Sequence, residues 1–159
     1  MMRRRGAHCI GKPRAATRGC LVVDPDVVAR RLLALNEALA ELARPEASDE
    51  RALATDSMLR AAVERWVQIA VEACIDIADH AVASEGWTPP ESARAAFTTL
   101  AAHGRLPLDL AQRLGDAAAL SNILVHDYVS VDLRRLAHAV RHDLTDLRSF
   151  AAEAAAWIR

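Results

Sequence analysis

The chain has 159 residues, which suits one domain with one hydrophobic core. Its residues are 52% hydrophobic but only 4% aromatic, and with six glycines and six prolines this composition favours helices over sheets. The formal net charge of −1 argues against a protein that binds nucleic acid through an overall basic surface.

Residues 1–23 form a basic segment with six Lys or Arg residues and no acidic residue, so the rest of the chain carries −7. No apolar stretch follows Arg3–Arg5, so the segment does not look like a secretory signal. We predict a disordered tail or a start codon placed too far upstream, with a basic arm for nucleic acid as the alternative. Residues 24–159 are predicted to form the helical domain.

Five helices are expected, over residues 26–43, 49–84, 91–102, 107–126 and 132–157. In the first, leucine and valine recur every three or four residues from Val28 to Leu42, which indicates one buried stripe. Asp24 and Pro25 form a plausible start signal, and Pro45 is expected to end this helix.

The longest helix shows the same spacing, with its apolar residues running from Leu59 to Ala81. Gly86 and Gly104 are predicted to end the second and third helices. Ser130 or Asp132 is a candidate cap for the last helix. The sequence therefore predicts an all-α fold, an up-and-down bundle of about five helices.

The cysteines and the apolar runs indicate where the protein functions. Cys74 lies on an apolar helical face and is expected in the core, whereas Cys9 and Cys20 fall in the basic segment. A reduced, cytoplasmic protein is the simplest interpretation. No run of 18 apolar residues exists, so no membrane span is expected.

Residues 120–128 read Leu-Ser-Asn-Ile-Leu-Val-His-Asp-Tyr and are the most informative stretch of the sequence. Asn122 and His126 are four residues apart, so they share one face of the fourth helix. A histidine there can exchange protons near neutral pH. The plain alternatives are a histidine that interacts with the helix dipole and, for Tyr128, a half-buried residue at the helix end.

The stretch Asn-Ile-Leu-Val-His-Asp-Tyr over residues 122–128 resembles the motif of HepT-like toxins from the HEPN group. That motif is an arginine, four residues, a histidine, one residue and a tyrosine. Residues 64–80 are similar to the long helix of the same family, so the resemblance covers about residues 26–150. It implies a HEPN-like fold and a homodimer in which two motifs share one cleft.

The resemblance also implies a metal-independent endoribonuclease that needs no cofactor, in which the RNA 2′-hydroxyl attacks the neighbouring phosphate. His126 would move a proton, with Asn122 beside it and Asp127 in a supporting position. A nucleotidyltransferase (MntA-like) antitoxin would be the partner, and it would attach AMP to Tyr128, which would block the RNA site through charge and bulk.

Ser121 stands where the family has its arginine, and a serine gives phosphate neither a positive charge nor a bidentate contact. Three explanations are open: a weakly active or inactive relative, an engineered change, or another arginine in its place. The candidate substitutes are Arg113, Arg134, Arg135 and an arginine of a partner subunit. The alternative functions are a silent module that binds antitoxin or RNA, and a purely structural helical dimer.

Two residue pairs at helical spacing, each with at least one histidine, complete the set of candidates. Asp76 and His80 are four residues apart, which predicts a helix-face hydrogen bond or, by the resemblance, a supporting role at the active cleft. His138 and His142, with Asp143 adjacent, have a spacing that suits zinc, but no third ligand is evident. A solvated helix face is the expected explanation for that pair, and no metal site is predicted.

Overall fold

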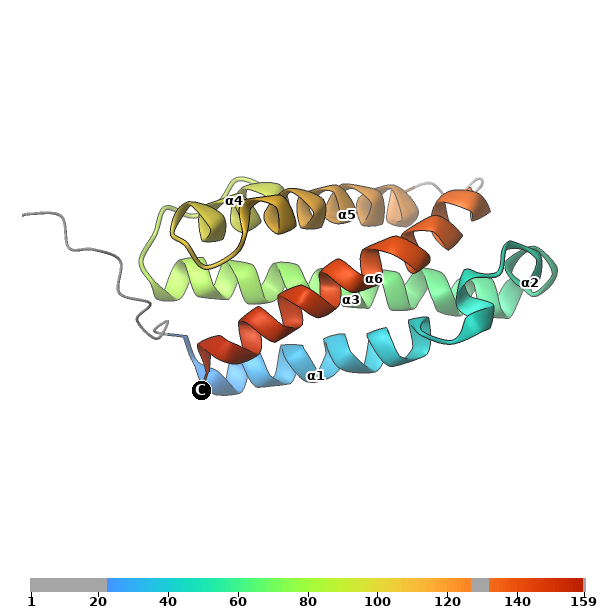
Figure 1. Ribbon diagram of the computed structural model, residues 1–159, viewed down its shortest axis with the longest axis horizontal. Coiled ribbons are helices and arrows are strands. Elements are labelled where there is room, and N and C mark those ends of the chain that lie inside the picture. The colour runs from blue at the N-terminus through green and yellow to red at the C-terminus, as the bar shows by residue number, and fades with distance from the viewer. Residues whose placement is uncertain (1–22, 127–131, 159) are drawn as a thin grey trace, which may run out of the picture.

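The structure, a computed structural model, describes residues 23–126 and 132–158, and this part of the chain contains helices and no strand (Figure 1). The segment predicted as a basic tail lies outside the described residues except for Val23, and so do Asp127 and Tyr128. The elements are α1 (Pro25–Leu42), the 3₁₀ helix η1 (Pro45–Ser48), α2 (Glu50–Thr55), α3 (Ser57–Ser84), α4 (Ala93–Ala102), α5 (Leu108–His126) and α6 (Leu133–Trp157).

The first helix begins as its sequence predicts. The Asp24 carboxylate accepts hydrogen bonds from the backbone N–H groups of Asp26 and Val27, and Pro25 takes the first helical position. The whole leucine and valine stripe of α1 is buried. Pro45 starts η1 after the helix has ended, so the predicted stop is confirmed.

The predicted continuous helix over residues 49–84 is wrong, because the chain leaves the helical conformation at Asp56. This residue is extended, with φ −115° and ψ 102°, and ends α2. Its carboxylate then accepts hydrogen bonds from the N–H groups of Met58 and Leu59, which starts α3 in a new direction. Asp49 caps α2 in the same way.

We expect Asp56→Ala to lower the free energy of unfolding by about 0.5–2 kcal/mol, because two N–H groups at the start of α3 lose their acceptor. Asp56→Asn is the matched control, since asparagine caps helices about as well as aspartate. Urea denaturation of the two variants measures the difference. Equal losses in both would show that the charge, rather than the cap, matters at this turn.

The other ends follow local signals. Gly86 and Gly104 have φ values of 67° and 70°, a left-handed conformation that glycine adopts without strain after a helix. Ser92 caps α4, which therefore starts two residues later than expected. Asp132 caps α6 by accepting from the N–H groups of Arg134 and Arg135, which confirms one of the two predicted caps.

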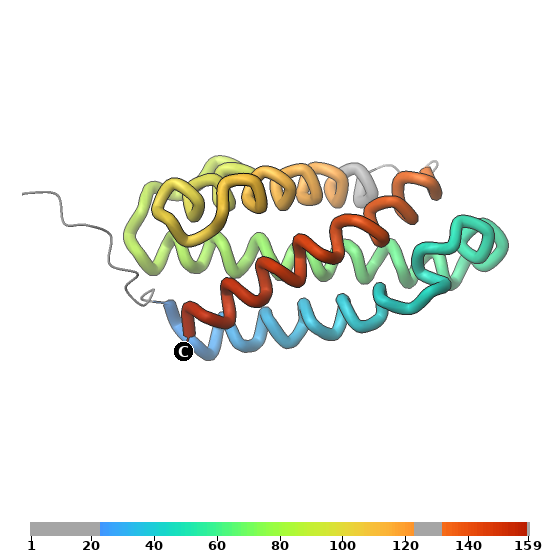
Figure 2. The backbone as a smooth tube through the Cα atoms, viewed as in Figure 1, coloured from blue at the N-terminus to red at the C-terminus, as the bar shows by residue number. Residues whose placement is uncertain are grey.

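Four long helices, α1, α3, α5 and α6, run along the bundle in alternating directions, and α6 crosses the face seen in Figures 1 and 2 obliquely. α1 packs chiefly against α3, and the short α4 packs against α5. α5 ends and α6 begins at one end of the bundle, whereas α3 ends at the opposite end (Figure 1). None of the described helices is long and apolar enough to cross a membrane.

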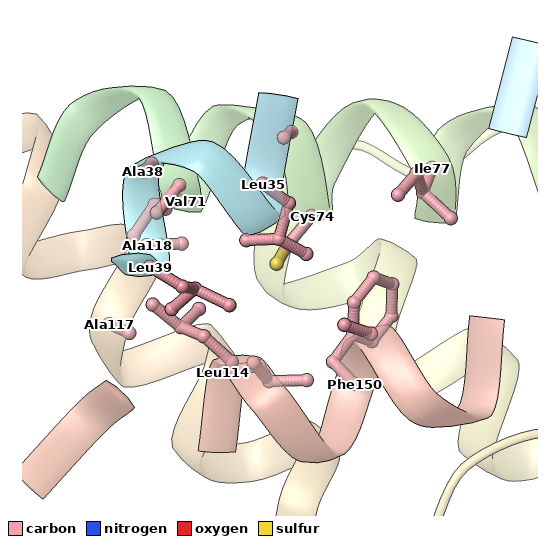
Figure 3. Packing of buried hydrophobic residues seen from close by; sticks show 14 of the residues in the cluster. Leu35, Ala38, Leu39, Val71, Cys74, Ile77, Leu114, Ala117, Ala118 and Phe150 are labelled. Atoms are coloured by element: carbon pink, nitrogen blue, oxygen red, sulfur yellow. The ribbon is translucent and has the colours of Figure 1, made fainter. Parts of the chain in front are cut away.

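The core is built from the four long helices together. Leu35 of α1, Cys74 of α3, Leu114 of α5 and Phe150 of α6 meet in its centre (Figure 3), and each is at most 1% exposed. Burial raises the pKa of the Cys74 thiol far above its ordinary value, so this thiol stays protonated. The prediction that Cys74 is a core residue is confirmed.

Candidate functional site

The site predicted from the sequence lies where α5 ends and α6 begins. His126 is the last residue of α5, and Asn122, one turn earlier, has an exposed side chain. Because the helix is continuous from Asn122 to His126, these two positions share one face of α5, as predicted. Asp127 and Tyr128, the remaining motif residues, follow directly but lie outside the described residues.

Ser121 differs from its neighbour Asn122 because it faces the interior. Its side chain is 8% exposed, and it is the one buried polar residue within the described part of the chain. A serine in this place leaves the end of α5 without the positive charge that the family motif carries there. An arginine here would have to extend from a buried position to reach solvent.

We expect Ser121→Arg to lower the free energy of unfolding by about 1–3 kcal/mol, because a larger side chain must be accommodated in a packed position. Asn122→Arg is the matched control, since the same side chain in the adjacent exposed position should change stability by less than about 0.5 kcal/mol. Thermal unfolding followed by circular dichroism compares the two. Equal melting temperatures would mean that Ser121 has room for the arginine.

Arg113, one of the three candidate substitutes within the chain, is already held by two carboxylates. Its Nε atom donates to both oxygens of Asp146 at 3.0 and 2.9 Å, and Nη1 donates to Asp109 at 3.0 Å. Asp109 and then Asp146 raise the pKa of Arg113, and Arg113 lowers that of Asp109. This cation links α5 to α6, and its charge is already balanced.

Arg134 and Arg135, the other two candidates, lie together at a pocket. A cavity of about 430 Å³ is lined by Leu120, Arg134, Arg135 and His138, and it therefore joins the last turns of α5 to the first turns of α6. Neither guanidinium forms a salt bridge with a carboxylate of the described residues, in contrast to Arg113. Sequence reasoning weighed His138 as part of a solvated helix face or as a zinc ligand and missed its place in this pocket.

Asp76 and His80 do not join this cluster within the chain. Asp76 pairs with Arg31 of α1 at 3.1 Å. His80 Nε2 accepts the backbone N–H of Asp24 at 3.1 Å and also lies 3.5 Å from the Ser84 hydroxyl. Both residues belong to the last three turns of α3, whose end is opposite to that of α5 (Figure 1). Their contacts tie α1 to α3, and the predicted bond between them is replaced by these partners.

His138 and His142 stack on each other along α6, with ring centroids 4.2 Å apart and the planes tilted by 37°. Burial, followed by repulsion from Asp146, raises the pKa of the nearby Asp143, while the two histidines oppose this shift. Within the described residues, no three His, Cys, Asp or Glu side chains gather into a set that could hold a metal ion.

Comparison with known proteins identifies the family. The model of the family described as Ribonuclease HepT-like matches residues 35–154. The chain belongs to the HepT-like ribonuclease family. The mRNA nuclease HepT of Shewanella oneidensis is 37% identical to this HepT-like chain over 95 residues, which are 60% of the chain and 71% of that relative. Residues 35–154, which match the family model, include both the end of α5 and the residues that line the pocket.

Solved structures support the fold of this HepT-like chain. The tri-AMPylated HEPN toxin of Shewanella oneidensis, in complex with its MNT antitoxin, superposes with a TM-score of 0.75 at 29% identity. The match covers 82% of this chain and 98% of the toxin. YutE of Bacillus subtilis, a cytosolic protein of unknown function, also gives 0.75 over 86% of this chain and 92% of its own, and at 17% identity it shows the fold alone. The predicted HEPN-like, all-α fold is confirmed.

Proposed function

We propose that this chain is the toxin of a toxin–antitoxin pair, a metal-independent endoribonuclease that acts as a homodimer in the cytoplasm. The observation that carries the proposal is the match of residues 35–154 to the HepT-like ribonucleases, which includes Asn122 and His126 on one face of α5. The relatives point the same way, since one is an mRNA nuclease and another is a toxin bound to its antitoxin.

The proposed reaction is a transesterification within RNA. His126 takes the proton of a ribose 2′-hydroxyl as its oxygen forms a bond to the adjacent phosphorus. The bond from phosphorus to the 5′-oxygen then breaks, and that oxygen takes up a proton from water, which leaves a 2′,3′-cyclic phosphate and a 5′-hydroxyl. The transition state concentrates negative charge on the phosphate oxygens, so cationic or hydrogen-bonding groups must lie beside them.

A second candidate, a silent HEPN module that binds antitoxin or RNA without cleavage, is favoured by one observation. Ser121 is neither charged nor exposed, so the α5 motif supplies no phosphate-binding arginine of its own. Loss of one such donor typically costs about a hundredfold or more in rate. The two candidate functions share a fold and a partner, but only the ribonuclease cleaves RNA.

Inducible expression in bacteria separates these candidates. The ribonuclease proposal expects growth arrest with the natural chain and loss of arrest with His126→Ala. The silent module expects no arrest with the natural chain but arrest with Ser121→Arg. If neither chain arrests growth and neither purified protein cleaves RNA, the ribonuclease proposal fails. The melting temperature of Ser121→Arg must be measured in parallel, since that change is expected to lower stability.

The partner is proposed to be a nucleotidyltransferase antitoxin of the MntA kind that transfers AMP to Tyr128. The support is that the superposed Shewanella toxin is tri-AMPylated and bound to an MNT antitoxin. Intact mass after incubation with the antitoxin and ATP should rise by whole AMP units. An unchanged pattern in Tyr128→Phe, or no rise in the natural chain, would contradict this role.

A further inference from the structure

We infer that Arg134 and Arg135 form the RNA phosphate site of this chain, in the pocket that they line with Leu120 and His138. The inference rests on the proposed function and says where the positive charge comes from when Ser121 replaces the motif arginine. Phosphate binding would then come from arginines in the first turn of α6, whereas the family motif places its arginine in α5.

The pocket lies between the end of α5 and the start of α6. Leu120 on its wall is the residue before Ser121, so the pocket lies at the level of α5 where the motif arginine is missing, although Ser121 itself faces the interior and does not line it. Arg134 and Arg135 are the second and third residues of α6, which begins shortly after α5 ends. The two arginines therefore reach the same end of the bundle from the next helix along the chain.

The pocket contains two guanidinium groups, those of Arg134 and Arg135. No carboxylate of the described residues pairs with either guanidinium, so both keep donors for an anion. Two other arginines of α5 and α6 are engaged: Arg113 by Asp109 and Asp146, and Arg141 by Glu50 at 3.2 Å. Guanidinium groups bind phosphate oxygens in a bidentate manner, so two adjacent ones suit a phosphodiester.

The side chains that line the pocket can contact more of an RNA than its phosphate. The Asp132 carboxylate already accepts from the backbone N–H groups of Arg134 and Arg135, so an anion here must be bound by side chains and not by the helix end. A volume of about 430 Å³ exceeds the needs of a phosphate alone. Leu120 and the aliphatic parts of the arginines offer an apolar wall to a ribose or base, and His138 adds a ring nitrogen.

Binding of a short single-stranded RNA tests this site without any need for cleavage. The probe is fully 2′-O-methylated, so it lacks the attacking hydroxyl, and it carries a fluorophore for anisotropy measurements over a range of salt concentrations. We expect Arg134→Ala/Arg135→Ala to weaken Kd at least tenfold. The slope of log K against log salt should flatten by about 1.4, since each phosphate contact contributes about 0.7 on a single strand.

Arg148→Ala is the matched control, because Arg148 is exposed on the same helix and forms no salt bridge within the described residues. It lies 13 positions beyond Arg135, about 20 Å along the helix axis. Its Kd and slope should stay within twofold of the natural chain. A lysine pair at positions 134 and 135 should restore the slope but not the full affinity, because lysine keeps the charge and loses the bidentate geometry.

The outcomes separate this inference from the proposed function. An alanine pair that binds the probe like the natural chain, or a natural chain that does not bind it, overturns the inference. So does an alanine pair that keeps RNA binding and loses only the antitoxin, since the pocket would then be a protein contact. If binding depends on both arginines but unmodified RNA is never cleaved, the phosphate site stands and the ribonuclease proposal falls.

Discussion

Replacing His126 by alanine is expected to slow RNA cleavage by about 10²–10⁴-fold, the range that a positioned general acid or base contributes. The same variant should bind the 2′-O-methylated RNA with a Kd close to that of the natural chain. The reason is that His126 ends α5 and acts on the proton of the attacking hydroxyl, whereas the proposed phosphate contacts come from α6. Single-turnover cleavage of a labelled RNA measures the rate.

His103→Ala provides the control for this prediction, because His103 is an exposed histidine at the end of α4 and does not line the pocket. Its cleavage rate should stay within about twofold of the natural rate, in line with a surface change remote from the chemistry. If His126→Ala cleaves at the natural rate, proton transfer does not depend on this imidazole, and the proposed mechanism is wrong even where RNA is cleaved.

Truncation of Phe150 to alanine is expected to lower the free energy of unfolding by about 3–5 kcal/mol. Phe150 is completely buried, and its ring contacts Phe97 edge-on at 5.7 Å and Trp157 at 5.9 Å between centroids. The change removes both aromatic contacts, including the one to α4, and leaves a cavity in the core. A loss of this size is a large part of the total of about 5–15 kcal/mol that holds a domain folded.

Urea denaturation gives the free energy, with Ser149→Ala as the control at the adjacent, exposed position. Ser149 only returns a hydrogen bond to the Thr145 carbonyl of its own helix, so its loss should change stability by less than about 0.5 kcal/mol. If Phe150→Ala loses less than about 1.5 kcal/mol, the core collapses around the gap, and the centre seen in Figure 3 is looser than its burial indicates.

Most of the fold could be predicted because each long helix carries its own apolar stripe and its own end signals. The stripe of α1 and the caps at Asp24 and Asp132 are local features, and they needed no knowledge of the other helices. The break at Asp56 was missed because helix-forming residues lie before and after the short polar group Thr55–Ser57, and one long helix was the simpler interpretation. Ser, Thr and Asp favour caps and turns, so this group was the signal that could have located the break.

The candidate site was predicted less completely, because its residues belong to two helices, α5 and α6, that come together only in the folded protein. The motif could be read along one stretch of α5, yet the burial of Ser121 depends on what packs against that face. Of the partners of Arg113, Asp109 is at helical spacing, but Asp146 is 33 residues away and gave no signal. Only the folded structure shows that Arg113 is already paired with Asp146, which makes it a poor substitute for the motif arginine. The structure also shows that Arg134 and Arg135 line one pocket with Leu120.

The protonated thiol at the centre of the core has a use in measuring motion. In a chain whose Cys9 and Cys20 are changed to serine, Cys74 is the sole thiol, and it reacts with an alkylating reagent only when α3 separates from its neighbours. The rate of alkylation therefore reports how often the bundle opens. Measured with and without RNA or antitoxin, this rate reveals whether either ligand holds the helices together.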